Sequence, residues 1–371
     1  MMADHTHDGA ATAPGQQRRY ACSSCGAAVA FDPGTTTLAC PYCGSRTDIA
    51  VTAGTKNDFA AYVATAPSPV SGLPAVSVRC DRCGSTEETT ALSGRCPSCA
   101  GAVVVGDDLG GRLKAPDGVV AFAVTRERAT AEFAQWAGSR WFAPNALKKV
   151  VRTDSMSGCY LPHWGFDDRT STDYTGRRGE HYWVTETYTV TVDGRQETRT
   201  RQVQKTHWYP ASGRVSRAFV DVVAPAVTSP DRHLLDQLGP WETGTATAYD
   251  PALLAGFDTP RYSVTAQDGF ADARRQMARQ IEHDCRADIG GDEQQVSTMD
   301  TTDADVLFRL LLMPLWMATY LVGGRTYHVY VNANTGEVVG ERPWSAVKIS
   351  LAVLAAVAAL AAVLVAYRVN H

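Results

Sequence analysis

The sequence predicts an α+β protein made of two small cysteine-bearing β modules, a mixed α+β body with antiparallel hairpins, and a C-terminal transmembrane helix. Three observations lead to this prediction. Eight of the ten cysteines form C-x-x-C pairs in the first hundred residues, alternating strand patterns fill the middle of the chain, and a long uncharged segment stands near its end. With 371 residues, 44% of them apolar, the chain is long enough for about two ordinary domains.

The first nineteen residues are small and polar and contain no apolar run. Because a secretion signal needs such a run, residues 1–19 predict a disordered leader. The whole chain has a formal net charge of -4 and a pI near 6.1. This balance argues against a protein that coats nucleic acid, which usually has a strongly basic domain.

The first cysteine module spans residues 20–50. It contains two C-x-x-C pairs, Cys22/Cys25 and Cys40/Cys43. Such a turn places two sulfurs on one side of a metal ion, and the glycine that follows each pair lets the backbone turn tightly. The stretches "AAVAF" and "TTTLA" fit two strands joined by a turn at Asp32-Pro33-Gly34.

The second module spans residues 77–106 and also contains two C-x-x-C pairs. Its pairs are Cys80/Cys83 and Cys96/Cys99. The last pair is followed by Ala100 in place of glycine. The stretches "TEETTAL" and "AVVV" predict another hairpin, with its turn at Ser93-Gly94.

These two modules predict zinc ribbons that hold two structural Zn²⁺ ions. Four thiolates complete a tetrahedral zinc site and leave no position open for water or substrate, so such a site is structural. Disulfides are the less favoured alternative, because the chain has no secretion signal and cytosolic thiols stay reduced. Iron in the same sulfur cage is a second alternative, since spacing alone does not separate the two metals.

Zinc ribbons are surfaces for recognition, and charge separates two kinds of partner. The first hundred residues hold seven basic and eight acidic residues, and each four-thiolate site adds about two negative charges. Binding to phosphates needs clustered lysine and arginine. A protein partner is therefore favoured over nucleic acid.

Residues 51–76 and 107–118 are rich in small and polar residues and predict linkers, and residues 119–345 form the larger α+β domain. Thr125 can N-cap a helix whose core-facing stripe begins with Phe133, Trp136 and Ala137. Pro144 would end this helix. A second helix, "DGFADARRQMARQIEHDCRADIG", has one apolar face. That face carries Phe270, Ala273, Met277, Ile281 and Cys285.

Hairpins make up the rest of this domain. "YWVTETYTVTV" and "RQETRTRQVQKTHW" flank Asp193-Gly194, which favours a tight β-turn. A last hairpin turns at Asn334-Thr335-Gly336. "YLPHWGF" at residue 160 resembles "LMPLWMATY" at residue 312, which suggests an internal duplication.

The search for catalytic motifs predicts that the protein is not an enzyme. The sequence contains no G-x-G-x-x-G, no Walker A loop, no H-E-x-x-H and no G-x-S-x-G. His163, His181 and His207 could cluster as a site, but packed strand histidines are the favoured interpretation. Asp167 and Asp168 are a candidate carboxylate pair, with turn residues as the favoured interpretation. Cys159 and Cys285 are expected to be buried small hydrophobes.

Residues 346–368 predict a transmembrane tail anchor. From Ile349 to Tyr367 the chain has no charge, and as a helix this stretch would span about 28 Å, close to the roughly 30 Å core of a bilayer. Lys348 and Arg368 bracket it. We expect a single-pass tail anchor with the body of the protein in the cytoplasm.

Taken together, these residues resemble a bacterial family of membrane-anchored proteins with transcription-factor-IIB-type double zinc ribbons, often labelled as similar to primosomal protein N′, a helicase. The resemblance rests on the C-x-x-C-G knuckles, on "YLPHW", and on "LMPLWMATYLVGGRTYHVYVNANTGEVVGERPWSAVKI". It implies a membrane-associated adaptor, and some relatives look to act with phage-shock-type and flotillin-like envelope-stress proteins. The helicase label lacks support here, because the motor motifs are missing.

Two functions follow as expectations. The first is a non-enzymatic adaptor or scaffold that recruits protein partners to the inner membrane, where two tethered weak sites would give avidity. The alternative is a nucleic-acid-binding ribbon protein linked to replication or transcription, without helicase activity.

Overall fold

The structure, a computed structural model, describes residues 22–65, 75–80, 85–96, 102–105, 114–140, 156–192, 195–228, 232–322, 324–341 and 346–370. It is a mixed α+β protein with antiparallel sheets and one apolar C-terminal helix, as the sequence predicts. The expected leader 1–19 lies outside the described residues.

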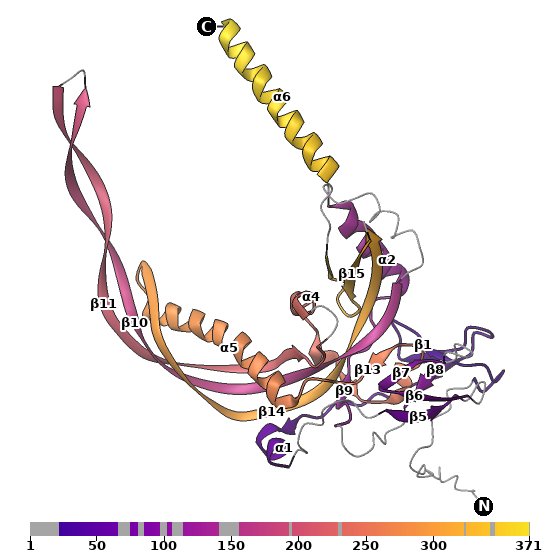
Figure 1. Cartoon of the computed structure of the whole chain (residues 1–371). Helices are drawn as coiled ribbons and strands as arrows, with labels where there is room; N and C mark the ends of the chain where they lie inside the picture. Colours follow the sequence, from indigo (N-terminus) through magenta and orange to yellow (C-terminus); the bar gives the residue numbers. More distant parts are fainter. Residues whose placement is uncertain are drawn as a thin grey trace, which may run out of the picture.

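A long, strongly curved antiparallel sheet forms the centre of the molecule (Figure 1). Its main strands follow the order β11-β10-β14-β15-β16. Their bounds are β10 Met156–Val192, β11 Arg195–Pro225, β14 Glu293–Val322, β15 Arg325–Asn332 and β16 Val338–Gly340. Three short strands attach to it, namely β4 Asn57–Asp58, β9 Gly118–Val119 and β12 Thr247–Ala248.

The predicted hairpin around Asp193-Gly194 is confirmed by the register of β10 and β11, in which Val192 faces Arg195. The two turn residues themselves lie outside the described residues. β14 pairs with β10 only as far as Gly179, so beyond this point β10 and β11 continue as a two-stranded arm of residues 180–192 and 195–207. The arm projects away from the body (Figure 1).

Two helices cover the sheet, and both begin at the same kind of cap. α2 spans Arg126–Gly138, and its N-cap Thr125 accepts a hydrogen bond from the backbone of Arg128. α5 spans Ala266–Ile289, and its N-cap Thr265 accepts one from Asp268. The hydroxyl of each cap satisfies a backbone N–H that the first helical turn would otherwise leave unpaired.

The predicted faces of both helices point into the core. In α2, Phe133 and Ala137 are buried and Trp136 packs against the same cluster. In α5 the buried stripe recurs every three to four residues, as an amphipathic helix requires. It contains Ala273, Met277, Ile281, Cys285 and Ile289. α2 ends at Gly138, before Pro144, which lies outside the described residues.

The two Pro-x-Trp segments make the same contacts, which supports the suggested duplication. The indole of Trp164 in β10 donates to the carbonyl oxygen of Val264 at 2.9 Å, just before α5. The indole of Trp316 in β14 donates to the carbonyl oxygen of Val124 at 2.8 Å, just before α2. Each tryptophan therefore holds the N-terminus of the helix from the other half of the chain.

The backbone around these tryptophans repeats as well. Ala226 donates to the carbonyl oxygen of Pro162 at 2.9 Å and accepts from Val264 at 3.0 Å. Ala333 donates to the carbonyl oxygen of Pro314 at 3.1 Å and accepts from Val124 at 2.8 Å. Two helix-plus-hairpin units with the same internal bonds thus form the body around an approximate two-fold relation.

The N-terminal modules pack against this body, although we expected flexible linkers to present them. The first module has strands β1 Ala30–Phe31, β2 Thr37–Ala39 and β3 Arg46–Asp48. The backbone N–H of Phe31 donates to the carbonyl oxygen of Ala255 at 3.0 Å, and its ring contacts Phe257. Leu38 lies in the same apolar cluster, so module and body share one core.

The second module is also joined to the body. Its strands are β5 Val76–Arg79, β6 Thr86–Thr89, β7 Ala91–Arg95 and β8 Ala102–Val104, and β7 pairs with β13 Thr259–Pro260. The prediction of a turn at Ser93-Gly94 is wrong. Both residues lie within β7, where the buried hydroxyl of Ser93 bonds to Phe257 and Thr259 of the body.

The stretch 51–76 does more than link the modules. Its residues 57–65 form β4 and helix α1 Phe59–Thr65, and the ring of Phe59 packs between Phe166 and Phe308 at centroid distances of 5.6 Å each. Phe59 and Tyr62 of the apolar stretch "FAAYVA" are partly buried against this cluster, and the small and polar residues around the stretch gave no sign of this packing. Of the other expected linker, residues 107–113 lie outside the described residues.

The remaining helices are α4 Arg232–Gln237, η1 Thr243–Thr245, η2 Pro251–Leu254 and α6 Ala346–Asn370. α6 contains the segment Lys348–Arg368, whose mean hydropathy is 2.8 and none of which is buried against the rest of the protein. It is long and apolar enough to cross a membrane. It leaves the body on the side opposite the cysteine modules (Figure 1).

We predict that Gly269→Ala lowers the free energy of unfolding by about 1–2 kcal/mol, measured by urea denaturation in detergent micelles. A Cβ at this position of α5 would lie 2.5 Å from Cδ1 of Trp164, and overpacking outweighs the gain in helix propensity. Gly138→Ala is the matched control, because no atom lies within 4 Å of its added Cβ. A stabilising Gly269→Ala would contradict the packing described for Trp164.

Candidate metal centre and buried ion-pair cluster

Two matching backbone knuckles build the first cysteine cluster. In one, Cys22 donates to the carbonyl oxygen of Ala27 at 2.7 Å, and Gly26 donates back to Cys22 at 2.8 Å. In the other, Cys40 donates to Ser45 at 2.9 Å and Gly44 donates back to Cys40 at 3.0 Å. The two glycines have φ of 74° and 71°, the left-handed region that glycine enters without steric cost.

The knuckles bring four sulfurs together. The ligand atoms of Cys22, Cys25, Cys40 and Cys43 all lie within 4.8 Å of one another. The sulfur of Cys22 is 3.4 Å from that of Cys43, and Cys25 is 3.6 Å from Cys40. A tetrahedral zinc site with Zn–S of about 2.3 Å has sulfur–sulfur edges of about 3.8 Å. These four cysteines therefore have the arrangement of a group that could hold a metal ion.

The thiols influence one another's protonation. The backbone N–H groups of Ser24 and Cys25 lower the pKa of Cys22 to about 6, because they stabilise its thiolate. The N–H of Ser45 acts in the same direction on Cys43, but the three neighbouring sulfurs outweigh it and raise the pKa of Cys43 to about 12. Four thiolates repel one another, and a divalent cation among them would remove that repulsion.

The second cluster is described only in part. Cys80 is 1% exposed and Cys96 is 2% exposed, whereas Cys83 and Cys99 lie outside the described residues. Cys80 donates to the carbonyl oxygen of Ser85 at 2.7 Å, the same bond over five residues that starts both knuckles of the first cluster. At Cys80, the predicted second site therefore has the same backbone hydrogen bond as the first cluster.

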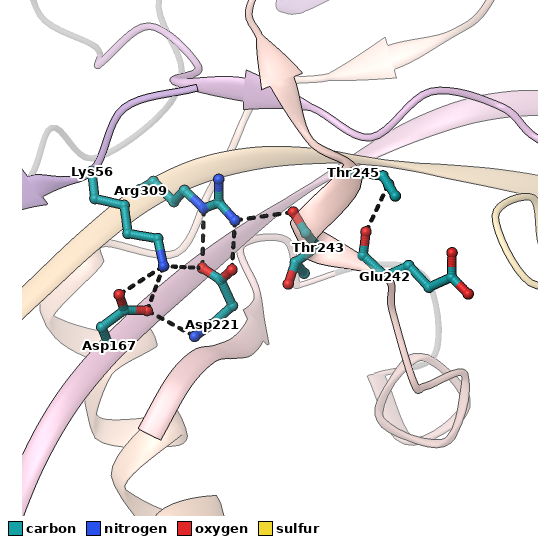
Figure 2. Close-up of polar contacts among 7 residues, drawn as sticks. All are labelled: Lys56, Asp167, Asp221, Glu242, Thr243, Thr245 and Arg309. Carbon is teal, nitrogen blue, oxygen red and sulfur yellow. Dashed lines mark hydrogen bonds and ion pairs between the residues drawn. The ribbon is translucent and has the colours of Figure 1, made fainter. Parts of the chain in front are cut away.

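A buried cluster of ion pairs joins the N-terminal region to three strands of the sheet (Figure 2). Lys56 donates to both carboxylate oxygens of Asp167 in β10 at 2.7 Å and lies 3.0 Å from Asp221 in β11. Arg309 in β14 forms a two-pronged pair with Asp221 at 3.0 and 2.5 Å and also donates to the carbonyl oxygen of Thr243 at 3.1 Å.

This cluster balances its own charge. The side chains of Arg309 and Asp221 are 6% and 7% exposed, so their charges are largely removed from water. Burial alone would raise the pKa of Asp221, but Arg309 and Lys56 outweigh it and hold the pKa below its usual value. Two cations face two carboxylates, which leaves no free base or nucleophile in the cluster. We assign it an architectural role.

The prediction that Asp167 and Asp168 are turn residues is wrong, and they do not form a carboxylate pair. Both lie inside β10, where successive side chains point to opposite faces. Asp167 faces Lys56, whereas Asp168 is 1% exposed and neither of its oxygens has a hydrogen-bond partner among the described residues. Burial and the neighbouring carboxylate of Asp303 raise the pKa of Asp168 to about 6.

The three histidines do not cluster. His163 is buried in the body and faces Pro225 across the ladder, whereas His181 and His207 lie at the base of the arm. His181 faces Thr206 and His207 faces Glu180, so the two rings stand on opposite faces of the arm. His181 instead contacts the carboxylate of Glu293 at 2.8 Å.

The two remaining cysteines are buried as predicted. Cys159 is 7% exposed, and burial raises its pKa to about 12. Cys285 is fully buried among the side chains that α5 packs against the sheet. Neither thiol has the exposure or the lowered pKa of a reactive cysteine.

Sequence reasoning missed the ion-pair cluster. Its members are far apart in the chain, since Lys56 and Asp167 are separated by 111 positions in sequence number. The available signal was the charge of Asp167 and Arg309 within otherwise apolar strand segments, "YLPHWGFDD" and "VLFRLLLMPLW". A charge in a buried strand requires a partner, although the sequence does not say which.

Comparison with known proteins gives one relative and no family. The chain is 26% identical over 334 residues to the uncharacterized protein YdjG of Bacillus subtilis strain 168, which covers 89% of this chain and 92% of that protein. No family model matches the sequence. No solved structure matches it either.

We predict that Cys25→Ser lowers the zinc content of the full-length protein by about one ion per chain, measured by plasma mass spectrometry after purification in detergent. The serine oxygen is a poor substitute for a thiolate in a four-sulfur site. Cys285→Ala is the control, because this thiol lies in the core and not in a cluster. Unchanged zinc content in Cys25→Ser would exclude the first cluster as a metal site.

We also predict that Asp168→Asn stabilises the protein at pH 7 by about 1–3 kcal/mol and has no such effect at pH 4. The pKa of this carboxyl is about 6 in the folded protein, above the ordinary value of 3.8 for an aspartic acid side chain. Its protonated form therefore contributes stability below about pH 4, and this contribution is lost as pH rises through 6.

The measurement for Asp168 is urea unfolding at several pH values between 4 and 8. Asp173→Asn is the control, because this exposed carboxylate pairs with Arg214, which lowers its pKa. Asp173→Asn should slightly lower the free energy of unfolding at pH 7, whereas Asp168→Asn should raise it. A destabilised Asp168→Asn at pH 7 would mean that the ionised carboxylate is satisfied by a partner.

Proposed function

We propose that this protein is a membrane-tethered zinc-ribbon adaptor that recruits a protein partner to the bacterial inner membrane. The observation that carries the proposal is the placement of the C-terminal helix and of the first cysteine module on the body. A helix able to cross a membrane leaves one side of the body, and a four-cysteine knuckle pair lies on the other side (Figure 1). With α6 in the bilayer, the cysteine modules would face the cytoplasm.

Two structural Zn²⁺ ions are part of this proposal. Cys22, Cys25, Cys40 and Cys43 would hold the first ion and leave no open coordination position. Cys80, Cys83, Cys96 and Cys99 would hold the second. Each ion would fix a knuckle surface for recognition. We infer zinc over iron because nothing in the described residues provides a redox partner for a cluster of this kind.

The exposed surface of the first module favours a protein partner. Tyr42 stands at the tip of the second knuckle with 71% of its surface exposed. Exposed aromatic side chains are frequent anchors of protein interfaces. Arg46 is the only basic residue between positions 20 and 50, and it already pairs with Asp32 at 2.9 Å. Such a surface lacks the cations that phosphate binding requires.

Nucleic-acid binding is the second candidate, and the arm is the observation in its favour. The arm combines arginines with exposed aromatic side chains, including Trp183 at 64% exposure. Arg201 lies over the ring of Tyr188, but it also pairs with Glu186, as does Lys205. Because glutamates compensate these cations, we favour the adaptor over this alternative.

The resemblance to membrane-anchored ribbon proteins extends the proposal to envelope stress. It implies a phage-shock-type or flotillin-like protein as the partner. We propose no enzymatic activity, since the charged cluster around Asp221 is balanced and the buried thiols are unreactive.

We predict that Tyr42→Ala reduces capture of the protein partner at least about fivefold in a crosslinked pull-down of full-length, membrane-inserted protein. Cys22→Ser/Cys80→Ser should abolish capture. Tyr182→Ala is the matched control, because this tyrosine is also exposed but lies on the arm. Capture should survive nuclease treatment and about 0.3 M salt.

Two results would contradict the adaptor. Capture that disappears with nuclease, or recovery of DNA together with replication proteins, would favour the nucleic-acid alternative. Equal loss in Tyr42→Ala and Tyr182→Ala would mean that the knuckle does not select the partner.

A further inference from the structure

A cavity of about 510 Å³ lies at the β11 edge of the sheet, between α5 and the segment 239–243. This volume falls within the range of small-molecule sites. The adaptor function makes no use of it, and the cavity belongs to the body and not to the cysteine modules. Its lining combines one buried histidine, one tryptophan and a polar stripe of α5.

His163 provides an unused hydrogen-bond acceptor. The residue is 2% exposed and lines the cavity, and its Nδ1 lies 3.0 Å from the carbonyl oxygen of Leu161. Burial lowers its pKa to about 4, so the ring is neutral near pH 7 and Nδ1–H donates to that carbonyl. Nε2 then carries a lone pair and has no partner among the described residues. The ring of Trp241 lies 5.8 Å away.

The internal duplication indicates that packing alone does not require a histidine here. Leu315 occupies the matching position of the second Pro-x-Trp segment, and it packs in a cluster with Leu235 and Tyr330. The unit therefore folds with leucine at this position. In the first unit the same position faces a cavity and carries a polar ring.

A stripe of α5 forms the opposite wall. Asp272, Arg275, Gln276 and Arg279 recur at the spacing of one helix face. Arg275 bonds to Asp272, whereas Arg279 has no ion pair among the described residues. Gln276 uses its amide N–H to bond the carbonyl oxygen of Val223 at 2.9 Å, which leaves its own oxygen available.

Three carboxylates and two arginines line the cavity, and because Arg275 is paired with Asp272, Arg279 is the lining group that favours an anion. Asp221 also lines it, but Arg309 and Lys56 already neutralise this carboxylate. Asp236 of α4 is exposed to solvent. The positive charge of Arg279 is therefore not neutralised by an ion pair with any described side chain. A guanidinium matches the geometry of phosphate or carboxylate oxygens.

We propose that this cavity binds a small hydroxylated phosphate ester, with its phosphate at Arg275 and Arg279 and a hydroxyl donating to Nε2 of His163. Trp241 supplies an apolar wall for the carbon skeleton. The chemistry fits a soluble polyol phosphate and also the glycerol phosphate headgroup of a phospholipid. This site is independent of the adaptor function and of the metal centre.

The first test is calorimetric titration of full-length protein in maltoside micelles with sn-glycerol 3-phosphate and with inorganic phosphate. The wild-type protein should bind the glycerol ester more tightly. Arg279→Gln should weaken both ligands about tenfold. Arg286→Gln is the matched control, because this arginine of α5 pairs with Glu282 and does not line the cavity.

His163 has a separate signature in the same titration. His163→Leu should weaken the glycerol ester about tenfold and leave inorganic phosphate unchanged, because only the ester has a hydroxyl. His163→Gln should retain part of the difference, since its amide oxygen can accept. Thermal melting of each variant verifies folding, and leucine at the matching position 315 makes the first substitution compatible with the unit.

The second test separates the two sources of the ligand. Full-length protein is placed in nanodiscs of phosphatidylcholine alone or with phosphatidylglycerol, and each is titrated with sn-glycerol 3-phosphate. Equal binding in both identifies a soluble ligand. Binding that phosphatidylglycerol suppresses, and that Arg279→Gln also removes, identifies a lipid headgroup.

Two outcomes would overturn the proposal. One is the absence of binding of either phosphate compound in micelles and in phosphatidylcholine nanodiscs. The other is binding that neither His163→Leu nor Arg279→Gln alters. Loss of partner capture with unchanged ligand binding would reject the adaptor function alone.

Discussion

The ion pairs among Lys56, Asp167, Asp221 and Arg309 determine how the parts of this protein are joined. One side chain comes from the segment after the first cysteine module, and the others come from three neighbouring strands. The side chains of Arg309 and Asp221 are 6% and 7% exposed, and loss of one partner of such a buried pair costs about 3–5 kcal/mol because the other stays buried and unpaired. Asp221 sits at a bulge with φ of 48°, so the curvature of the sheet and the ion pairs depend on each other.

The duplicated framework explains how one chain forms a sheet with such long strands. In each unit a tryptophan holds the helix of the other unit through its indole, so neither unit can complete its core alone. The units then diverge. α5 is 24 residues long and α2 is 13, and β10 continues into an arm that β14 does not follow. The cavity lies where the two units meet, because His163 of the first unit and α5 of the second unit both line it.

The cysteine cluster, the cavity histidine and the ion-pair cluster differ in how far each is exposed to solvent. The sulfurs of the first cluster lie at the surface of a module, with two of the four cysteines exposed, where a metal ion could reach them. The histidine of the cavity is buried and neutral. The ion-pair cluster adjoins the cavity through Asp221 and is balanced in charge. We therefore propose the exposed knuckle and the open cavity as the recognition surfaces, with the buried charges in an architectural role.

The sequence by itself determined the features that depend on neighbouring residues. The C-x-x-C-G knuckles, the cap at Thr125, the buried face of α5 and the hairpin around Asp193-Gly194 each need only a few adjacent positions, and all agree with the structure where it is described. Tertiary structure alone decided the packing of Phe59 against the sheet, the strand position of Ser93-Gly94, the separation of the histidines and the surroundings of Asp167 and Asp168. These depend on contacts between residues far apart in the chain, and local composition carries no information on which distant partner will offset the cost of burying a charge or a polar group.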